Sequence, residues 1–199
     1  MRKGYKKGET KLTDILKLTE NILVRDGYAG LSMRKVAREM GITAGNLQYY
    51  FATKDELMSA VLDNILHAYM QQFDAIRNTN TIEAQFKELI QALFSDVYSE
   101  KAVKLFPELW AMASNDLLVK EKVSAMYETY RRMLSVLIKE LNPQLSEEQA
   151  GNLSIYIQSS IEGHSLFIGV DKRWHKKAHD IISLATESFQ QLILNQGKH

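Results

Sequence analysis

The chain has 199 residues with no cysteine, 45% apolar residues, 25% charged residues and a net charge of +1. These values are ordinary for a soluble globular protein; they exclude a disulfide framework or a cysteine-based metal site, and they fit a reducing cytoplasm, where we expect the protein to work. We expect neither a signal peptide nor a membrane partner, because the first residues lack an apolar stretch and no apolar run approaches the ~20 residues of a membrane span.

The small net charge hides two parts of opposite sign. Residues 1–54 contain 11 Lys and Arg against 5 Asp and Glu, whereas the remaining residues contain 14 against 19. The first part is therefore basic and the remainder acidic. Because basic surfaces attract phosphate backbones and acidic surfaces repel them, we expect any contact with nucleic acid to be made by the first part.

The first eleven residues are polar and basic and include two glycines, which predicts a mobile arm. This arm could lie against phosphates or in a minor groove through Lys3, Lys6 and Lys7, or it could be a solvated tail without a role. Apolar residues at helical spacing then predict an amphipathic helix over residues 12–26, which would support the elements that follow.

Residues 32–51 predict a helix-turn-helix motif. Ser32 is a good N-cap for the first helix of the motif, since its hydroxyl can accept from a backbone N–H of the first turn. Gly41 follows the last apolar residue of this helix, where helices commonly end in a left-handed residue. Thr43 can then cap the second helix, and an alanine at the helix contact, Ala37, allows the two helices to approach.

The second helix of the motif has two different sides. Leu47 and Phe51 form an apolar side that faces the core. The opposite side is small, polar and aromatic, as is typical of a helix that lies in the DNA major groove, and it consists of Ala44, Gly45, Asn46, Gln48, Tyr49 and Tyr50. Amide side chains can pair with adenine edges, and tyrosine hydroxyls can reach phosphate oxygens.

A further helix begins after the motif. Thr53 and Glu56 have the spacing of a capping box. Lys54 lies between them in the first turn, where a cation is unfavourable for the helix dipole unless an anion binds at that end. A helix N-terminus with a lysine is a good phosphate site, so Lys54 is predicted to contact the DNA backbone.

Over residues 13–62 a set of residues follows in a fixed order without gaps: Gly27, Tyr28, Ser32, Met33, Arg34, Val36, Ala37, Gly41, Ile42, Gly45, Asn46, Leu47, Tyr49, Tyr50, Phe51, Lys54 and Leu57. This run resembles the DNA-binding domain of the TetR family of bacterial transcriptional regulators. The resemblance implies contacts with double-stranded DNA by Ser32, Arg34, Thr43, Ala44, Gly45, Asn46, Gln48, Tyr49, Tyr50 and Lys54.

Three of these residues leave alternatives open. Gln48 stands where the family very often has Tyr, so a phosphate contact could be exchanged for a contact with a base or a water molecule. Tyr50 could instead be partly buried in the core. Arg34 could simply lie in solvent on its helix.

The rest of the chain is helical in pattern, which predicts an all-α protein of about nine helices. We expect a three-helix DNA-binding domain over residues 9–69 and a larger regulatory and dimerisation domain over residues 70–199. A long helix over residues 54–77 would connect the two. Pro107 predicts a helix break, because proline fits only the first turn of a helix, and a capping box predicts a helix start at Ser146 to Gln149.

The resemblance also implies a homodimer in which the last two helices pair with those of a second copy. Apolar residues at helical spacing fit this interface, although they could also form only internal core: Leu153, Ile157, Ile161, Ile182, Phe189 and Leu192. A dimer of helix-turn-helix units needs half-sites about 34 Å apart, which predicts a pseudo-palindromic operator.

A pocket for a small-molecule effector in the second domain is likewise implied by the resemblance. Aromatic residues with a few polar groups suit such a pocket, although they could equally be core: Phe94, Tyr98, Phe106, Trp110, Tyr127, Tyr130 and His164. Residues 106–118 faintly resemble the sensor domain of betaine-inhibitor-type members of the family, which names no ligand for this chain.

Signals for catalysis are absent from the sequence. There is no glycine-rich phosphate loop and no nucleophile elbow. His175 and His179 could share a helix face for a metal, but no third ligand is evident, so we expect no enzyme, metal or cofactor. The sequence predicts a DNA-binding repressor released from its operator by a small molecule; the alternative is a regulator of the same family without such an inducer, either an activator or one gated by a protein.

Overall fold

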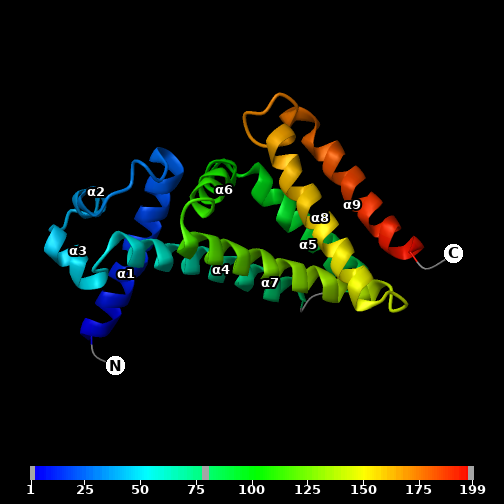
Figure 1. Ribbon diagram of the computed structural model, residues 1–199, viewed down its shortest axis with the longest axis horizontal. Helices are drawn as coiled ribbons and strands as arrows, with labels where there is room; N and C mark the ends of the chain where they lie inside the picture. Colours follow the sequence, from blue (N-terminus) through cyan, green and yellow to red (C-terminus); the bar gives the residue numbers. More distant parts are fainter. Residues whose placement is uncertain (1–2, 78–80, 197–199) are drawn as a thin grey trace. The chain divides into compact units, whose positions relative to one another are not determined.

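The computed structural model describes the backbone of residues 3–77 and 81–196, and the side chains of residues 10–68, 71, 75–76, 81–95 and 99–196. Within this part of the chain every regular element is helical, which confirms the all-α prediction (Figure 1). The helices are α1 (Lys3–Asp26), α2 (Met33–Glu39), α3 (Ala44–Tyr50), α4 (Lys54–Arg77), α5 (Ile82–Tyr98), α6 (Glu100–Ala113), α7 (Leu117–Leu141), α8 (Glu147–Ile168), the short 3-10 helix η1 (His175–Lys177) and α9 (Ala178–Asn195). In the described residues no helix has both the length and the apolar character that a membrane span requires.

The chain forms two compact units. The first unit consists of residues Met1–Tyr69 and Lys104–Val123, and the second of Met70–Val103 and Ser124–His199. Their boundaries fall inside α4, α6 and α7, so three helices contribute to both units. The division of function at residue 69 stays a prediction, but the unit that contains the helix-turn-helix motif also includes the segment Lys104–Val123, which sequence reasoning had assigned to the second domain.

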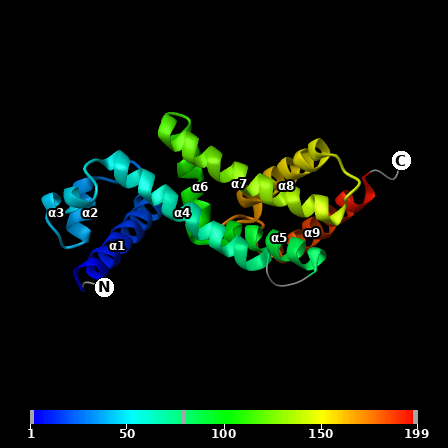
Figure 2. The ribbon, with the colours of Figure 1, turned by 90° about the horizontal axis from the view of Figure 1, so that it is seen from below.

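In the first unit, α1, α2 and α3 pack around the start of α4 (Figures 1 and 2). Each helix contributes fully buried apolar side chains, since the apolar stripes predicted from the sequence face one another. Buried residues come from every element of this unit, including the second half of α6 and the start of α7: Ile15, Ile22, Leu23, Val36, Leu47, Leu57, Val61, Leu105, Leu109 and Val119.

In the second unit, α5 packs against both α8 and α9, and η1 contacts the same two helices. Phe86 and Phe94 of α5 are fully buried, as are Ile157 of α8 and Ile193 of α9. The side-chain amide of Asn142 donates to the carbonyl of Ile193 at 2.9 Å, which satisfies a backbone acceptor in the last turn of α9.

Two predicted boundaries are wrong. The first helix begins at Lys3 and not after the eleven-residue arm, because glycine weakens a helix without removing a hydrogen-bond donor. The predicted break at Pro107 does not occur, since α6 runs from Glu100 to Ala113 with proline inside it. An interior proline costs about 3 kcal/mol, and full burial of Leu105 and Leu109 contributes about 1.5–3 kcal/mol each, which offsets that cost.

Candidate functional site

Local capping contacts set the geometry of the helix-turn-helix motif. The Lys35 N–H donates to the Ser32 hydroxyl at 3.3 Å at the start of α2. Gly41 adopts a φ of +64° after α2, and the next N–H, of Ile42, donates to the carbonyl of Ala37 at 3.0 Å. The chain therefore leaves α2 in a tight left-handed turn that only glycine adopts at little cost, as the sequence predicts.

The turn orients α3 so that one side lies in the core and the other side faces solvent. The Asn46 N–H donates to the Thr43 hydroxyl at 3.1 Å, which caps α3. Leu47 is completely buried, whereas Tyr49 is 85% exposed and its ring meets that of Tyr50 edge to face. Asn46 and Gln48 are exposed as well, so the polar side of α3 is available for a partner.

Gly45 has no structural requirement inside the chain. A Cβ atom at this position would meet no other atom within 4 Å, and its φ lies outside the left-handed region. Glycine inside a helix is about 1 kcal/mol less favourable than alanine, so Gly45 makes α3 less stable than alanine would. A backbone that must approach another molecule closely would explain this choice.

Four charged side chains fix the end of α1 to α2. Arg25 pairs with Asp26 and Glu39 at 2.6 and 2.9 Å, and Lys35 pairs with Asp26 at 2.8 Å. Hydrogen bonds from Arg25 and then Lys35 hold the pKa of the Asp26 carboxyl well below its usual range. Lys35 is therefore engaged within the protein, while Arg34 beside it is exposed and remains available to phosphate.

The start of α4 departs from the predicted capping box. The Glu56 N–H donates to the Thr53 hydroxyl at 3.1 Å, as expected. The Glu56 carboxylate, however, accepts from the N–H of Ala52 at 2.9 Å, one residue before the cap. The second bond of the capping box thus goes to the residue before the cap. Both hydrogen bonds tie the connection between α3 and α4 to Glu56 in the first turn of α4.

Lys54 lies against the turn that follows α1. Its ammonium nitrogen is 3.5 Å from the centroid of the Tyr28 ring and donates to the Tyr28 carbonyl at 3.4 Å. Partial burial lowers the pKa of Lys54, and the charge of Asp55 opposes that shift. Neither contact neutralises the ammonium charge, so the start of α4 still presents a cation.

The residues predicted to contact DNA therefore divide by their structural setting. The hydroxyls of Ser32 and Thr43 serve as helix caps, and Tyr50 is half-buried. The exposed residues without a capping role are Arg34, Ala44, Gly45, Asn46, Gln48 and Tyr49, and Lys54 is half-buried.

The predicted effector residues divide between the two units. Phe106 and Trp110 belong to the first unit, where their rings are 6.3 Å apart. In the second unit the buried ring of Phe94 meets His164 edge to face, and Tyr127 meets Tyr130 in the same way. The side chain of Tyr98 lies outside the described residues. These aromatic residues stay a prediction for effector binding.

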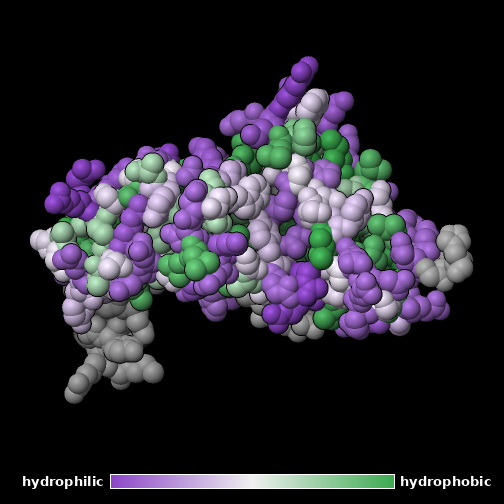
Figure 3. Space-filling model, viewed as in Figure 1, coloured by the Kyte–Doolittle hydropathy of each residue, from purple (hydrophilic) through white to green (hydrophobic). Residues whose placement is uncertain are grey.

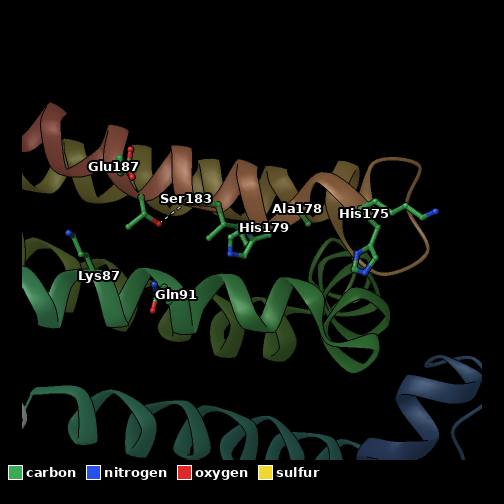
Figure 4. Close-up of a pocket in the computed structure, with 10 residues that line it drawn as sticks. Lys87, Gln91, His175, Ala178, His179, Ser183 and Glu187 are labelled. Atoms are coloured by element: carbon green, nitrogen blue, oxygen red, sulfur yellow. Dashed lines mark hydrogen bonds between the residues drawn. The ribbon is translucent and has the colours of Figure 1, made fainter.

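A groove between α5 and α9 was not predicted from the sequence. Its volume is about 630 Å³, and it is lined by Lys87 and Gln91 of α5 and by residues of η1 and α9 (Figure 4). Figure 4 shows Lys87 and Glu187 at one end and His175 at the other, with His179 and Ser183 between them. None of the predicted aromatic effector residues lines this α5–α9 groove, whose lining mixes charged and polar side chains with Ala178 and Ile182.

The residues predicted for the dimer interface are largely buried within one chain. Leu153, Ile157, Ile161 and Phe189 face the core of the second unit, and Ile182 and Leu192 are half-buried. Other large apolar residues on α8, α9 and their connection are exposed and were missed, because α8 is apolar on more than one side: Ile155, Tyr156, Leu166, Phe167, Trp174 and Leu184. Figure 3 shows apolar surface where the connection between α8 and α9 lies.

Comparison with known proteins gives one consistent result. Residues 15–61 match the family model described as bacterial regulatory proteins, tetR family. An HTH-type transcriptional regulator from the dhlA 5′ region of Xanthobacter autotrophicus is 26% identical over 165 residues, which is 80% of each chain. The HTH-type transcriptional regulator BetI of Vibrio vulnificus is 26% identical over 155 residues, covering 75% of this chain and 76% of the relative.

Solved structures share the fold at lower identity. A TetR transcription regulator from Haloarcula marismortui superposes with a TM-score of 0.71 at 20% identity, covering 93% of this chain and 95% of the other. A TetR-family regulator from Mesorhizobium loti gives a TM-score of 0.72 at 16% identity, covering 92% and 96%. The similarity therefore extends over both compact units and not only over the helix-turn-helix motif.

Proposed function

Because the chain belongs to the TetR family and is a helix-turn-helix transcriptional regulator, we propose that it is a repressor that leaves its operator when a small molecule binds the second unit. The observation that carries the DNA-binding half of this proposal is the exposed side of α3. This side carries two amides, a tyrosine and Gly45, a glycine that the fold itself does not require. The Thr43 cap and the buried Leu47 fix the helix in place. Such a regulator works where the chromosome is, which places it in the cytoplasm, and the mechanism needs no cofactor.

On DNA, the roles follow from chemistry and exposure. Asn46 and Gln48 are the side chains that can read base edges, since amides pair with adenine in the major groove. Arg34, Tyr49 and Lys54 suit phosphate oxygens, which position the motif without reading sequence. The side with base-reading capacity is short, so we expect specificity to rest on few positions in each half-site.

We propose that a second copy of the chain binds the exposed apolar residues of α8 and α9. Large apolar side chains that remain exposed together on one unit indicate a protein partner, and Ile155, Phe167 and Leu184 are 53%, 56% and 65% exposed. A twofold dimer would present two copies of α3 to half-sites about 34 Å apart, which predicts a pseudo-palindromic operator.

The effector proposal is supported by the α5–α9 groove. A volume of about 630 Å³ lies within the range of ligand pockets, roughly 300–1,000 Å³. Two lysines, Lys87 and Lys176, line it against one carboxylate, Glu187, and this balance favours an effector with acidic or hydrogen-bond-accepting groups. To release DNA, the effector must bind one conformation better than the other, and a difference of about 1–3 kcal/mol changes DNA affinity roughly 5–150-fold.

The DNA-binding proposal is tested by selecting duplexes from a random-sequence library with the full-length protein. We expect enrichment of a pseudo-palindrome, and we expect Asn46→Ala and Gln48→Ala to change the sequence that is enriched. Asn64→Ala removes an exposed amide on α4 and is the matched control, which should leave the sequence unchanged. Selection of no sequence by the wild type would contradict the proposal.

The effector proposal is tested with the enriched duplex and a panel of small molecules. A compound that releases the wild type should fail to release Ser183→Trp, in which the indole fills the α5–α9 groove, while DNA affinity without compound stays unchanged. If a compound releases both proteins equally, the groove is not the effector site. Release by no compound would favour the alternative, a regulator gated by a protein or acting as an activator.

A further inference from the structure

The turn after α1 is held from two sides by helices distant in sequence. On one side, the Tyr28 N–H donates to Oε2 of Glu108 in α6 at 3.0 Å. On the other side, the Lys54 ammonium of α4 donates to the Tyr28 carbonyl and lies over the Tyr28 ring. All three residues belong to the first unit, so a single turn residue links α6 to the first turn of α4.

Gly27 adapts the turn to the Glu108 carboxylate. It has a φ of +66°, and a Cβ atom at this position would lie 3.1 Å from Oε2 of Glu108. The left-handed backbone therefore favours glycine here, and a Cβ atom would in addition press against the Glu108 carboxylate. A backbone N–H that donates to a carboxylate forms a charge-assisted hydrogen bond, which is stronger than one to a neutral oxygen.

Pro107 gives α6 a weak point immediately before Glu108. Proline has no N–H, so the carbonyl of Val103 does not receive the helical hydrogen bond that residue 107 would otherwise donate. Val103 is the last residue of its segment in the second unit, and Lys104 is the first of the segment in the first unit. The helical ladder of α6 is thus interrupted where the chain passes from one unit to the other.

We infer that Glu108 is a positioning residue for DNA binding, which anchors the second half of α6 to Tyr28 and through Tyr28 fixes the Lys54 ammonium at the start of α4. The inference rests on the proposed function, in which Lys54 contacts a phosphate. An ammonium has three donors, so the bond to the Tyr28 carbonyl leaves capacity for an anion. A displacement of α6 would then alter the phosphate contact without any change in α3.

A double-mutant cycle tests this inference with the full-length protein. The probes are the duplex enriched from a random library by the wild type and an unrelated duplex of equal length, each titrated over a range of KCl concentrations. Lys54→Ala should weaken binding to both probes and reduce the salt slope by about one unit. Glu108→Ala should weaken both by about tenfold, the effect of losing a charge-assisted hydrogen bond, and should reduce the slope in the same way. The double variant should bind within about twofold of Lys54→Ala, because both changes remove the same contact.

Two further variants distinguish the length of the side chain at position 108 from its charge. Glu108→Gln keeps an acceptor at the same distance and should retain most of the affinity, whereas Glu108→Asp keeps the charge but is one methylene too short and should behave like Glu108→Ala. Glu121→Ala is the control for charge, since it removes an exposed carboxylate from the same unit. On electrostatic grounds alone it should bind DNA equally or more tightly, so weakening by Glu108→Ala has the opposite sign from a pure charge effect.

Each outcome decides a different statement. Additive losses in the double variant, or unchanged binding by Glu108→Ala while Lys54→Ala weakens it, overturn the inference and leave the proposed function intact. Unchanged binding by Lys54→Ala overturns the phosphate role of Lys54 itself, while selection with the α3 variants still tests sequence recognition. If Glu108→Ala unfolds, the comparison of Glu108→Asp with Glu108→Gln decides, and equal affinity of these two proteins refutes the inference.

Discussion

The replacement of Gly45 by alanine should make the protein more stable and a weaker DNA binder. A methyl group at this position would meet no atom within 4 Å, so it introduces no internal clash. Alanine is favoured over glycine in a helix by about 0.8–1 kcal/mol. Since α3 has only seven residues and Gly45 is its second, we expect about half of this gain, which raises the melting temperature by roughly 1–2 °C.

The same methyl group should interfere with DNA if the α3 backbone approaches the major groove closely. We expect affinity for the enriched duplex to fall about tenfold, equivalent to 1.4 kcal/mol. Thermal unfolding followed by circular dichroism measures the first effect, and fluorescence titration of the duplex measures the second. A gain in stability without a loss of affinity would show that Gly45 does not mark a close approach to DNA.

Gly151 in α8 provides the matched control. A Cβ atom there would lie 3.5 Å from the guanidinium of Arg131, which is ordinary contact with a flexible side chain. Gly151→Ala should therefore stabilise the second unit by a similar amount and leave DNA affinity unchanged. Equal loss of DNA affinity in both variants would refute the reasoning, because it would mean that rigidity, and not proximity, governs binding.

Three other predictions concern the second unit. Asn142→Ala should lower the free energy of unfolding by about 1–3 kcal/mol, because carbonyls at the end of α9 lose a buried donor; urea denaturation measures this, and an unchanged midpoint would contradict it. Glu residues in place of Ile155 and Leu184 should produce folded monomers in light scattering, with a large loss of affinity for a full palindrome and little loss for a half-site; a persistent dimer would exclude this surface. Hydrogen bonds from Arg131 lower the pKa of Glu128 from 4.5 to about 2, so its contribution to stability is present above pH 4.5 and is lost as the pH falls towards 2; Glu128→Gln should flatten the pH dependence of the melting temperature in that window, and parallel curves would refute the pairing.

The sequence predicts local structure well where a few neighbouring residues decide it. Ser32, Thr43 and Ser146 cap helices as their chemistry dictates, since each hydroxyl accepts from an N–H only three residues away, and Gly41 takes the left-handed conformation expected after α2. Family resemblance adds the expectation that α3 is the helix that reads DNA. The exposed side of α3 follows from the same local pattern, because period and polarity alone separate Leu47 from its neighbours.

Features set by distant contacts could not be predicted in this way. The helix persists through Pro107 because burial of Leu105 and Leu109 offsets the lost hydrogen bond, and the extent of that burial depends on the rest of the fold. The Glu108 carboxylate meets a turn 80 residues earlier in the chain. In sequence, Glu108 resembles any surface glutamate, and only the fold reveals that its partner is a backbone N–H.

Lys54 shows how the two kinds of information combine. From the sequence alone, a cation in the first turn of a helix argues for a bound anion, because the helix dipole repels it. The structure supplies an internal partner, the carbonyl and ring of Tyr28, which weakens that argument. Yet a carbonyl and a ring orient an ammonium without cancelling its charge, and burial lowers the pKa of Lys54 despite the opposing charge of Asp55. A positive charge that is held in place at a helix N-terminus is the arrangement that a phosphate would complete, so under the proposed function the contact with Tyr28 would orient the ammonium for DNA instead of replacing DNA.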